Sequence, residues 1–108
     1  MIEQTIRHIY SLLLSENYDE LERFTNGSRM SSNEICEAIL EYGYQLVSYP
    51  DNLKLDIVEV KNSSPREWSV VAPIYTSEEG LSDLSIELSL IENGKELYKS
   101  ELDNIRVR

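Results

Sequence analysis

The sequence predicts an α+β fold, with about three N-terminal helices packed on one face of an antiparallel sheet of about four strands. In the first part of the chain, apolar residues recur at spacings of three and four, the period of an amphipathic helix. After Gly43, apolar and polar residues alternate, the period of a strand with one buried face. We expect a single domain over residues 1–108, helical over 1–43 and strand-rich over 44–108.

The first two helices follow from spacing and from their end signals. The first is expected over residues 2–15, and the second opens at Asn17 and ends at Asn26-Gly27, because glycine tolerates a left-handed cap. The apolar stripe of the first helix consists of Ile2, Ile6, Ile9, Tyr10, Leu13 and Leu14.

The third helix has the clearest signal in the chain. Ser31 is followed three residues later by Glu34, which is the pattern of a capping box. The apolar residues continue at helical spacing until Gly43, where we expect the helix to stop.

Two strands and a short extended segment are expected next. The extended segment covers residues 44–49, and the strands cover about 53–60 and 68–76. Pro73 cannot donate a ladder hydrogen bond, so it marks an edge position or a bulge. One face of the second strand carries Trp68, Val70, Ala72 and Ile74.

The chain is expected to finish with a hairpin. A strand over about residues 84–91 leads into Asn93-Gly94, the favoured pair for a two-residue type I′ turn. The partner strand is expected over residues 95–103, and its apolar residues do not keep one parity. We therefore expect a bulge near Ser100.

The charge restricts the class of partner. The 108 residues include 20 acidic and 10 basic side chains, for a formal net charge of −10. This charge argues against nucleic-acid binding and against anionic lipid surfaces, because both are themselves anionic. We expect any charged partner to be a basic protein.

The sequence gives little indication of a metal site, a disulfide or a membrane span. One Cys and one His exclude an internal disulfide and the usual structural zinc sites, and we expect no cofactor. The longest apolar run, 12–14, is far below the roughly 20 residues of a membrane span. Glu3, Arg7 and His8 interrupt what would be the apolar stretch of a signal peptide, so we expect no export signal and a cytoplasmic location.

Two groups of acidic residues are candidate partner-binding sites. The spacing of the first places its members on one face of the third helix, which is either a solvated face or a docking stripe. The second lies between two predicted strands and is compatible with a turn, a recognition loop, or a divalent-metal or acid–base site, although it lacks the spacing of a calcium loop. The groups are Glu34, Glu37 and Glu41, and Glu78, Glu79 and Asp83.

A pocket between the helices and the sheet is the alternative kind of site. Its walls would be aromatic, and His8 or Asp83 would be its acid–base candidate, His8 being the only side chain that titrates near neutral pH. So small a domain leaves little volume for a cavity of the usual range of roughly 300–1,000 Å³. The lining candidates are Tyr42, Trp68, Tyr75 and Tyr98.

Residues 75–84, with the sequence Tyr-Thr-Ser-Glu-Glu-Gly-Leu-Ser-Asp-Leu, resemble the signature of a family of small uncharacterised bacterial domains. The signature is aromatic-Thr-x-Glu-Glu-Gly-x-Ser-Asp-Leu, and the likeness extends to the N-terminal helices and to residues 103–107. A basic residue often follows the glycine in that family, whereas this chain has Leu81. The resemblance implies no known activity and marks Trp68, Tyr75, Glu78, Glu79, Ser82 and Asp83 as the places to look.

Two functions from different classes remain open. The absence of any nucleotide-binding, nucleophile-elbow or zinc-protease motif favours a non-enzymatic protein-binding module. Its most concrete form is an immunity-type protein that neutralises a basic bacterial toxin. The order of elements also resembles a reduced nuclear-transport-factor-2-like or cystatin-like layout, which suggests a ligand-binding or catalytic domain. A homodimer is compatible with both, through a second sheet face that would carry Val71, Tyr75, Ile91 and Tyr98.

Overall fold

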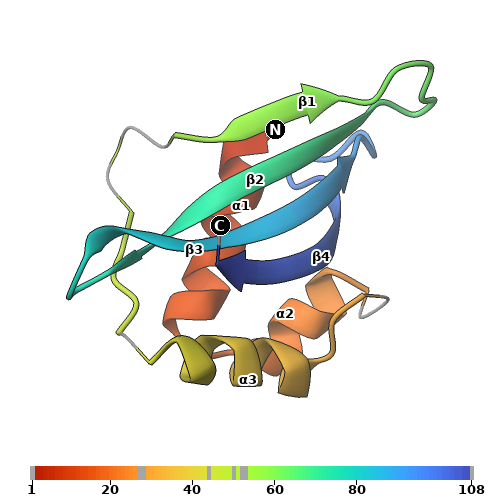
Figure 1. Cartoon of the computed structure of the whole chain (residues 1–108). Coiled ribbons are helices and arrows are strands. Elements are labelled where there is room, and N and C mark those ends of the chain that lie inside the picture. The colour runs from red at the N-terminus through yellow and green to blue at the C-terminus, as the bar shows by residue number, and fades with distance from the viewer. Residues whose placement is uncertain (1, 27–28, 44, 50, 52–53, 108) are drawn as a thin grey trace.

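A computed structural model describes residues 2–26, 29–43, 45–49, 51 and 54–107. Within them, three helices precede four strands, and the helices lie on one face of the sheet (Figure 1). The helices are α1 (Ile2–Leu14), α2 (Tyr18–Phe24) and α3 (Ser32–Tyr42), and the strands are β1 (Asp56–Glu59), β2 (Glu67–Thr76), β3 (Gly80–Ile91) and β4 (Lys99–Val107). The strands form one antiparallel sheet in the order β1-β2-β3-β4, which confirms the predicted α+β architecture.

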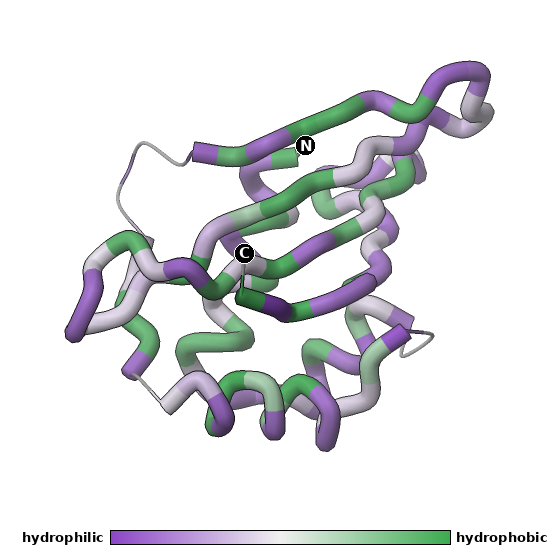
Figure 2. The backbone as a smooth tube through the Cα atoms, in the orientation of Figure 1, coloured by the Kyte–Doolittle hydropathy of each residue, from purple (hydrophilic) through white to green (hydrophobic). Residues whose placement is uncertain are grey.

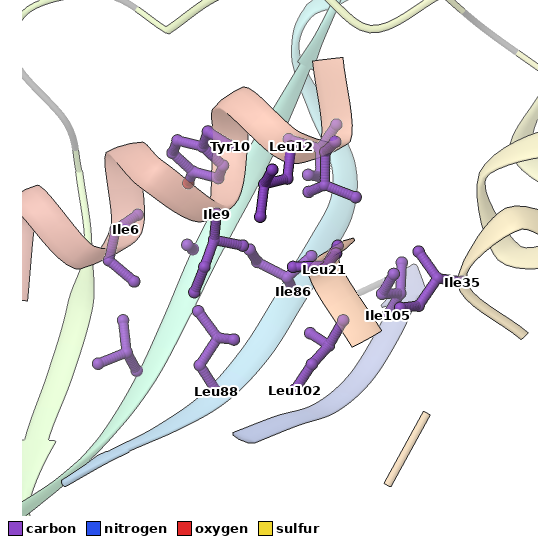
Figure 3. Packing of buried hydrophobic residues seen from close by; sticks show 14 of the residues in the cluster. Ile6, Ile9, Tyr10, Leu12, Leu21, Ile35, Ile86, Leu88, Leu102 and Ile105 are labelled. Carbon is purple, nitrogen blue, oxygen red and sulfur yellow. The ribbon is translucent and has the colours of Figure 1, made fainter. Parts of the chain in front are cut away.

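The core lies between α1 and the inner face of the sheet. Buried residues alternate with more exposed ones along β2 and most of β3, so these central strands present one buried face. Hydrophobic residues line the middle of both strands (Figure 2). The apolar stripe of α1 faces the sheet residues Ile86, Leu88 and Leu102, and Leu21 of α2 joins them (Figure 3). Burying each of these large side chains fully stabilises the fold by roughly 1.5–3 kcal/mol.

The helix boundaries agree with their sequence signals, and α3 agrees best. The hydroxyl of Ser31 accepts a hydrogen bond from the backbone N–H of Glu34 at 3.2 Å, and the Glu34 carboxylate accepts one from the N–H of Ser31 at 3.0 Å. Gly43 ends the helix with a φ of 85°, the left-handed conformation that glycine adopts without strain. At the end of α2, Asn26 adopts a φ of 67°, and Gly27 lies outside the described residues.

The first strand is shorter than predicted. β1 has four residues, all of them exposed, because it forms the edge of the sheet and α1 covers the central strands instead. Leu53, where we expected it to begin, lies outside the described residues. In the extended segment that we expected over 44–49, Leu46 forms a single antiparallel bridge to Thr76, and Tyr44 is not described.

Pro73 lies beside an irregularity in the sheet, as predicted, but the extra residues belong to β3. Between the pairs Pro73↔Ser85 and Tyr75↔Leu81, β2 has one residue and β3 has three. The pairing with β3 shifts register between Pro73 and Tyr75, and the last β2 residue that pairs with β1 is Val71. The carbonyl of Pro73 accepts a hydrogen bond from the hydroxyl of the buried Tyr10 at 2.9 Å. A side chain of α1 therefore fastens the helix to the irregular part of the sheet.

The predicted two-residue turn at Asn93-Gly94 is wrong. A connection over residues 92–98 joins β3 to β4, and the side chain of Asn93 accepts from the backbone N–H of Lys95 and donates to the carbonyl of Leu97. Asn93 thus builds a wider loop with its own side chain. This loop carries Tyr98 back to the core, where its N–H donates to Thr5 of α1.

The predicted bulge near Ser100 is also displaced. Glu87 pairs with Asn104 while Leu88 pairs with Leu102, so the extra residue is Asp103. Leu97 belongs to the loop and not to the strand, so Ser100 and Leu102 both face the core without a bulge between them. The irregularity therefore lies further along β4.

We expect the substitution Tyr10→Phe to lower the free energy of unfolding by about 1–2 kcal/mol, because it leaves the Pro73 carbonyl without its partner in a buried setting. Chemical denaturation measures this change. Tyr18→Phe serves as the control, since Tyr18 is a half-buried tyrosine whose raised pKa comes from burial and nearby charge and not from a hydrogen bond. Equal effects of the two substitutions would contradict the fastening role of Tyr10.

Candidate acidic interaction surface

The connection between β2 and β3 is a tight turn. Residues 77–79 form the turn, and Gly80, with a φ of 68°, opens β3. Leu81 and Asp83 already belong to the strand, so the loop expected over residues 77–83 is only three residues long.

This turn is fastened to the segment that follows α3. The N–H of Ser77 donates to the carbonyl of Gln45 at 2.9 Å, and the N–H of Val47 donates to the carbonyl of Tyr75 at 3.0 Å. The carboxylate of Glu78 accepts from the N–H of Gln45 at 3.2 Å and from the Ser77 hydroxyl at 2.8 Å. The Ser77 hydroxyl holds the pKa of Glu78 below its usual range, so this carboxylate is charged at neutral pH.

Glu79 joins the same turn to α3 itself. Its carboxylate accepts a hydrogen bond from the hydroxyl of Tyr42 at 2.5 Å, and its N–H donates to the hydroxyl of Thr76 at 3.1 Å. The bond to Glu79 raises the pKa of the Tyr42 hydroxyl, which stays protonated and keeps donating. Because Glu41 directly precedes Tyr42, the last turn of α3 and the turn of the hairpin form one acidic end of the molecule.

A groove of about 490 Å³ opens beside this acidic end, where α1 and α3 terminate. Glu16 is the one charged residue among the nine that line it. Neither α1 nor α3 carries a basic residue in its last turn, whereas α2 has Arg23 there. The lining residues are Leu13, Leu14, Glu16, Tyr18, Ile39, Leu40, Gly43, Gln45 and Leu46.

The structure thus brings together some of the predicted acidic residues and separates others. Glu41, Glu78 and Glu79 meet at what we call the acidic end, and Glu16, which the sequence analysis missed, lies beside them. The sequence signal that could have identified Glu16 is an acid two residues after the end of α1, a helix with no basic residue in its last turn.

The other predicted acids serve elsewhere. Glu34 caps the opposite end of α3, and its hydrogen bonds to Ser31 lower its pKa. Glu37 is exposed between the two ends of the helix. Asp83 lies on the outer face of the sheet, in a separate groove of about 310 Å³ whose lining includes Val71 and Pro73.

Of the five residues predicted to line a pocket, Trp68 and Tyr98 stack on each other, but the five do not share a cavity. Trp68 begins β2 and Tyr75 lies near its end, and a strand rises about 3.3 Å per residue, which separates them by roughly 23 Å. Trp68 stacks on Tyr98 at 5.3 Å, while His8 packs edge-to-face on Phe24 at 4.6 Å. Of four grooves of about 180 to 490 Å³ among the described residues, none of these four is lined by more than one of the five.

The second sheet face also differs from its prediction. Tyr98 stacks on the buried Trp68 and packs against the core, so it does not contribute to an outer apolar patch. Val71 and Ile91 are half-buried on that face. We expected little volume for a pocket between the helices and the sheet, and the groove of about 490 Å³ lies instead at the helix ends.

Among the described residues, no three His, Cys, Asp or Glu side chains form a group that would hold a metal ion. None of the described helices is long and apolar enough to cross a membrane.

A family model covers almost the whole of this arrangement. It is described as a domain of unknown function (DUF7668), and it matches residues 10–108, from the middle of α1 to beyond β4. The chain belongs to this family. No curated protein and no solved structure matches the DUF7668 chain. The match supports the resemblance to an uncharacterised family that the sequence suggested.

We expect the backbone amide of Gln45 to report the titration of Glu78. Because the pKa of Glu78 is depressed in the folded state, its bond to Gln45 is present above the ordinary glutamate range of about 4.3 and is lost as pH falls through the lower, folded pKa. The amide resonance of Gln45 in NMR should therefore shift with a midpoint below that range, and Glu78→Gln should abolish the shift. A midpoint at or above the ordinary value would contradict the hydrogen-bond assignment.

Proposed function

We propose that this domain is a non-enzymatic protein-binding module whose partner is a basic protein. Its most concrete form is an immunity-type protein of bacterial, cytoplasmic origin that neutralises a basic toxin. The observation that carries the proposal is the fastening of Glu78 and Glu79 to α3 and to the segment after it. Their charges are held in place before any partner arrives, so binding loses little conformational entropy there.

The distribution of positive charge supports the same function. Each arginine in the described ranges forms an ion pair with an acid outside the acidic end, although Arg106 also lines a groove that it shares with Glu41. The pairs are Arg7 with Glu3, Arg23 with Glu20, Arg29 with Asp103, Arg66 with Glu59 and Arg106 with Glu87. The acidic end consequently keeps its negative potential, which accelerates association with a basic partner at low salt.

The alternative of a small ligand-binding or catalytic domain loses the site on which it rested. Tyr42, Trp68, Tyr75 and Tyr98 do not share a cavity, and His8, which packs against Phe24, does not line the groove of Asp83. The groove that Asp83 lines has none of these aromatic residues. An interaction module therefore accounts better for where the charged residues lie.

Capture of partners from the source lysate at low and high salt, followed by affinity measurement with the identified protein, tests the proposal. We expect a basic partner, held more weakly at high salt, whose affinity falls at least about tenfold, or ~1.4 kcal/mol, in Glu78→Lys/Glu79→Lys. The variant Glu41→Lys should weaken binding without endangering the fold, because a cation suits the last turn of a helix.

The matched control places the same charge change elsewhere. Asp19→Lys and Asp56→Lys alter exposed acids on α2 and β1, outside the acidic end. They should leave the affinity within a few-fold of the unmodified chain. An equal loss of affinity in the control variants would mean that only the net charge matters. If Glu41→Lys and Glu78→Lys/Glu79→Lys both left the affinity unchanged, the acidic end would not be the binding site.

A further inference from the structure

The groove at the ends of α1 and α3 combines two features that rarely occur together on a surface. It exposes large aliphatic side chains: Leu40 is 69% exposed and Leu14 is 38% exposed. It also gathers negative potential, because the C-terminal ends of two helices meet there and each carries the negative end of a helix dipole. Isolated exposed leucines are ordinary, but here they line one groove of about 490 Å³.

The local sequence intensifies this potential where most helices reduce it. Basic residues are favoured in the last turn of a helix, yet Glu41 occupies the last turn of α3 and Glu16 follows the end of α1. Glu16, with a φ of 58°, occupies the left-handed position that closes α1. Its N–H donates to the carbonyl of Leu13 at 3.1 Å, and the N–H of Asn17 donates to that of Leu12 at 2.9 Å.

The geometry points to this groove as the docking site for a lysine or arginine side chain of the basic partner, together with an apolar side chain beside it. The aliphatic stem of the cation and its apolar neighbour would lie on Leu14, Leu40 and Leu46, and the charged group would reach Glu16 and the helix ends. Charge complementarity selects this occupant, since none of the lining residues is basic. The inference rests on the proposed function and names the side chains that the partner must present.

The fastened hairpin turn completes the site. Gln45 lines the groove and also binds Glu78 and Ser77 through its backbone, so the turn supports one wall. Tyr42 holds Glu79 at the same end of α3. A partner residue seated in the groove would therefore meet the charges of the acidic end at its rim.

The test uses hexylammonium chloride as the probe, with 1-hexanol and sodium hexanoate as its neutral and anionic counterparts, in NMR titrations of the full chain. We expect saturable shifts at the backbone amides of Leu14, Glu16, Leu40 and Leu46 with hexylammonium. Its affinity should exceed that of 1-hexanol several-fold, and hexanoate should leave these amides unmoved.

Two variants with matched controls separate charge from apolar contact. Glu16→Gln should lower the hexylammonium affinity several-fold toward that of 1-hexanol, whereas Glu37→Gln, which removes one charge from the exposed face of α3, should not. Leu40→Ser should weaken both hexylammonium and 1-hexanol, whereas Leu81→Ser, which removes another exposed leucine, should weaken neither.

The inference would be overturned if hexylammonium gave no saturable amide shifts. It would also be overturned if the shifts spread over all acidic residues and were unchanged by Glu16→Gln. The two proposals fail separately. A basic partner that depends on Glu41 but not on Leu40 would retain the function and reject the groove. Saturable hexylammonium binding with no basic partner would retain the groove as a cation site and reject the function.

Discussion

Pro73 is the constraint on which much of this structure depends. A proline in a sheet cannot donate to a neighbouring strand, and β1 no longer pairs with β2 beyond Val71. The pairing with β3 shifts register just after it. The carbonyl of Pro73 is satisfied by the hydroxyl of Tyr10, which fixes α1 against the irregular region. Past this point the segment over residues 45–47, not β1, pairs with the end of β2.

This exchange of partners creates the acidic end. Because residues 45–47 directly follow α3, pairing them with β2 draws the β2–β3 turn toward the last turn of that helix. Glu78 and Glu79 then find donors in Gln45 and Tyr42. The irregularity in the sheet and the candidate binding surface are therefore consequences of the same residue.

Local signals predicted what local interactions determine. The capping box at Ser31 and Glu34 and the stop at Gly43 depend on residues within a few positions of one another, and each occurs as expected. The two-residue turn at Asn93-Gly94 failed because the side chain of Asn93 bonds within a wider loop, whose end is held by a distant contact, the bond from the N–H of Tyr98 to Thr5.

The candidate site depends even more on distant contacts. Glu78 and Glu79 were recognised because they stand together in the sequence, but their partners lie 33 and 37 residues away. Glu16 could not be singled out from the sequence, because an acid after one helix becomes part of a site only when the fold places the end of a second helix beside it. The predicted aromatic pocket failed because its residues belong to separate places in the fold. Trp68 and Tyr75 lie near opposite ends of β2, while Tyr42 lies on α3.

Electrostatics distinguishes the two ends of α3. At its start, Glu34 caps the helix and its charge suits the positive end of the dipole. At its finish, Glu41 opposes the dipole, an arrangement that costs roughly 0.3–1 kcal/mol at an exposed position. The described arginines, which would relieve this cost, instead pair with acids on α1, α2 and the sheet. A cation supplied by a partner would offset the unfavourable interaction between Glu41 and the negative end of the helix dipole. Part of the binding free energy would therefore come from relief of a repulsion that exists in the free protein.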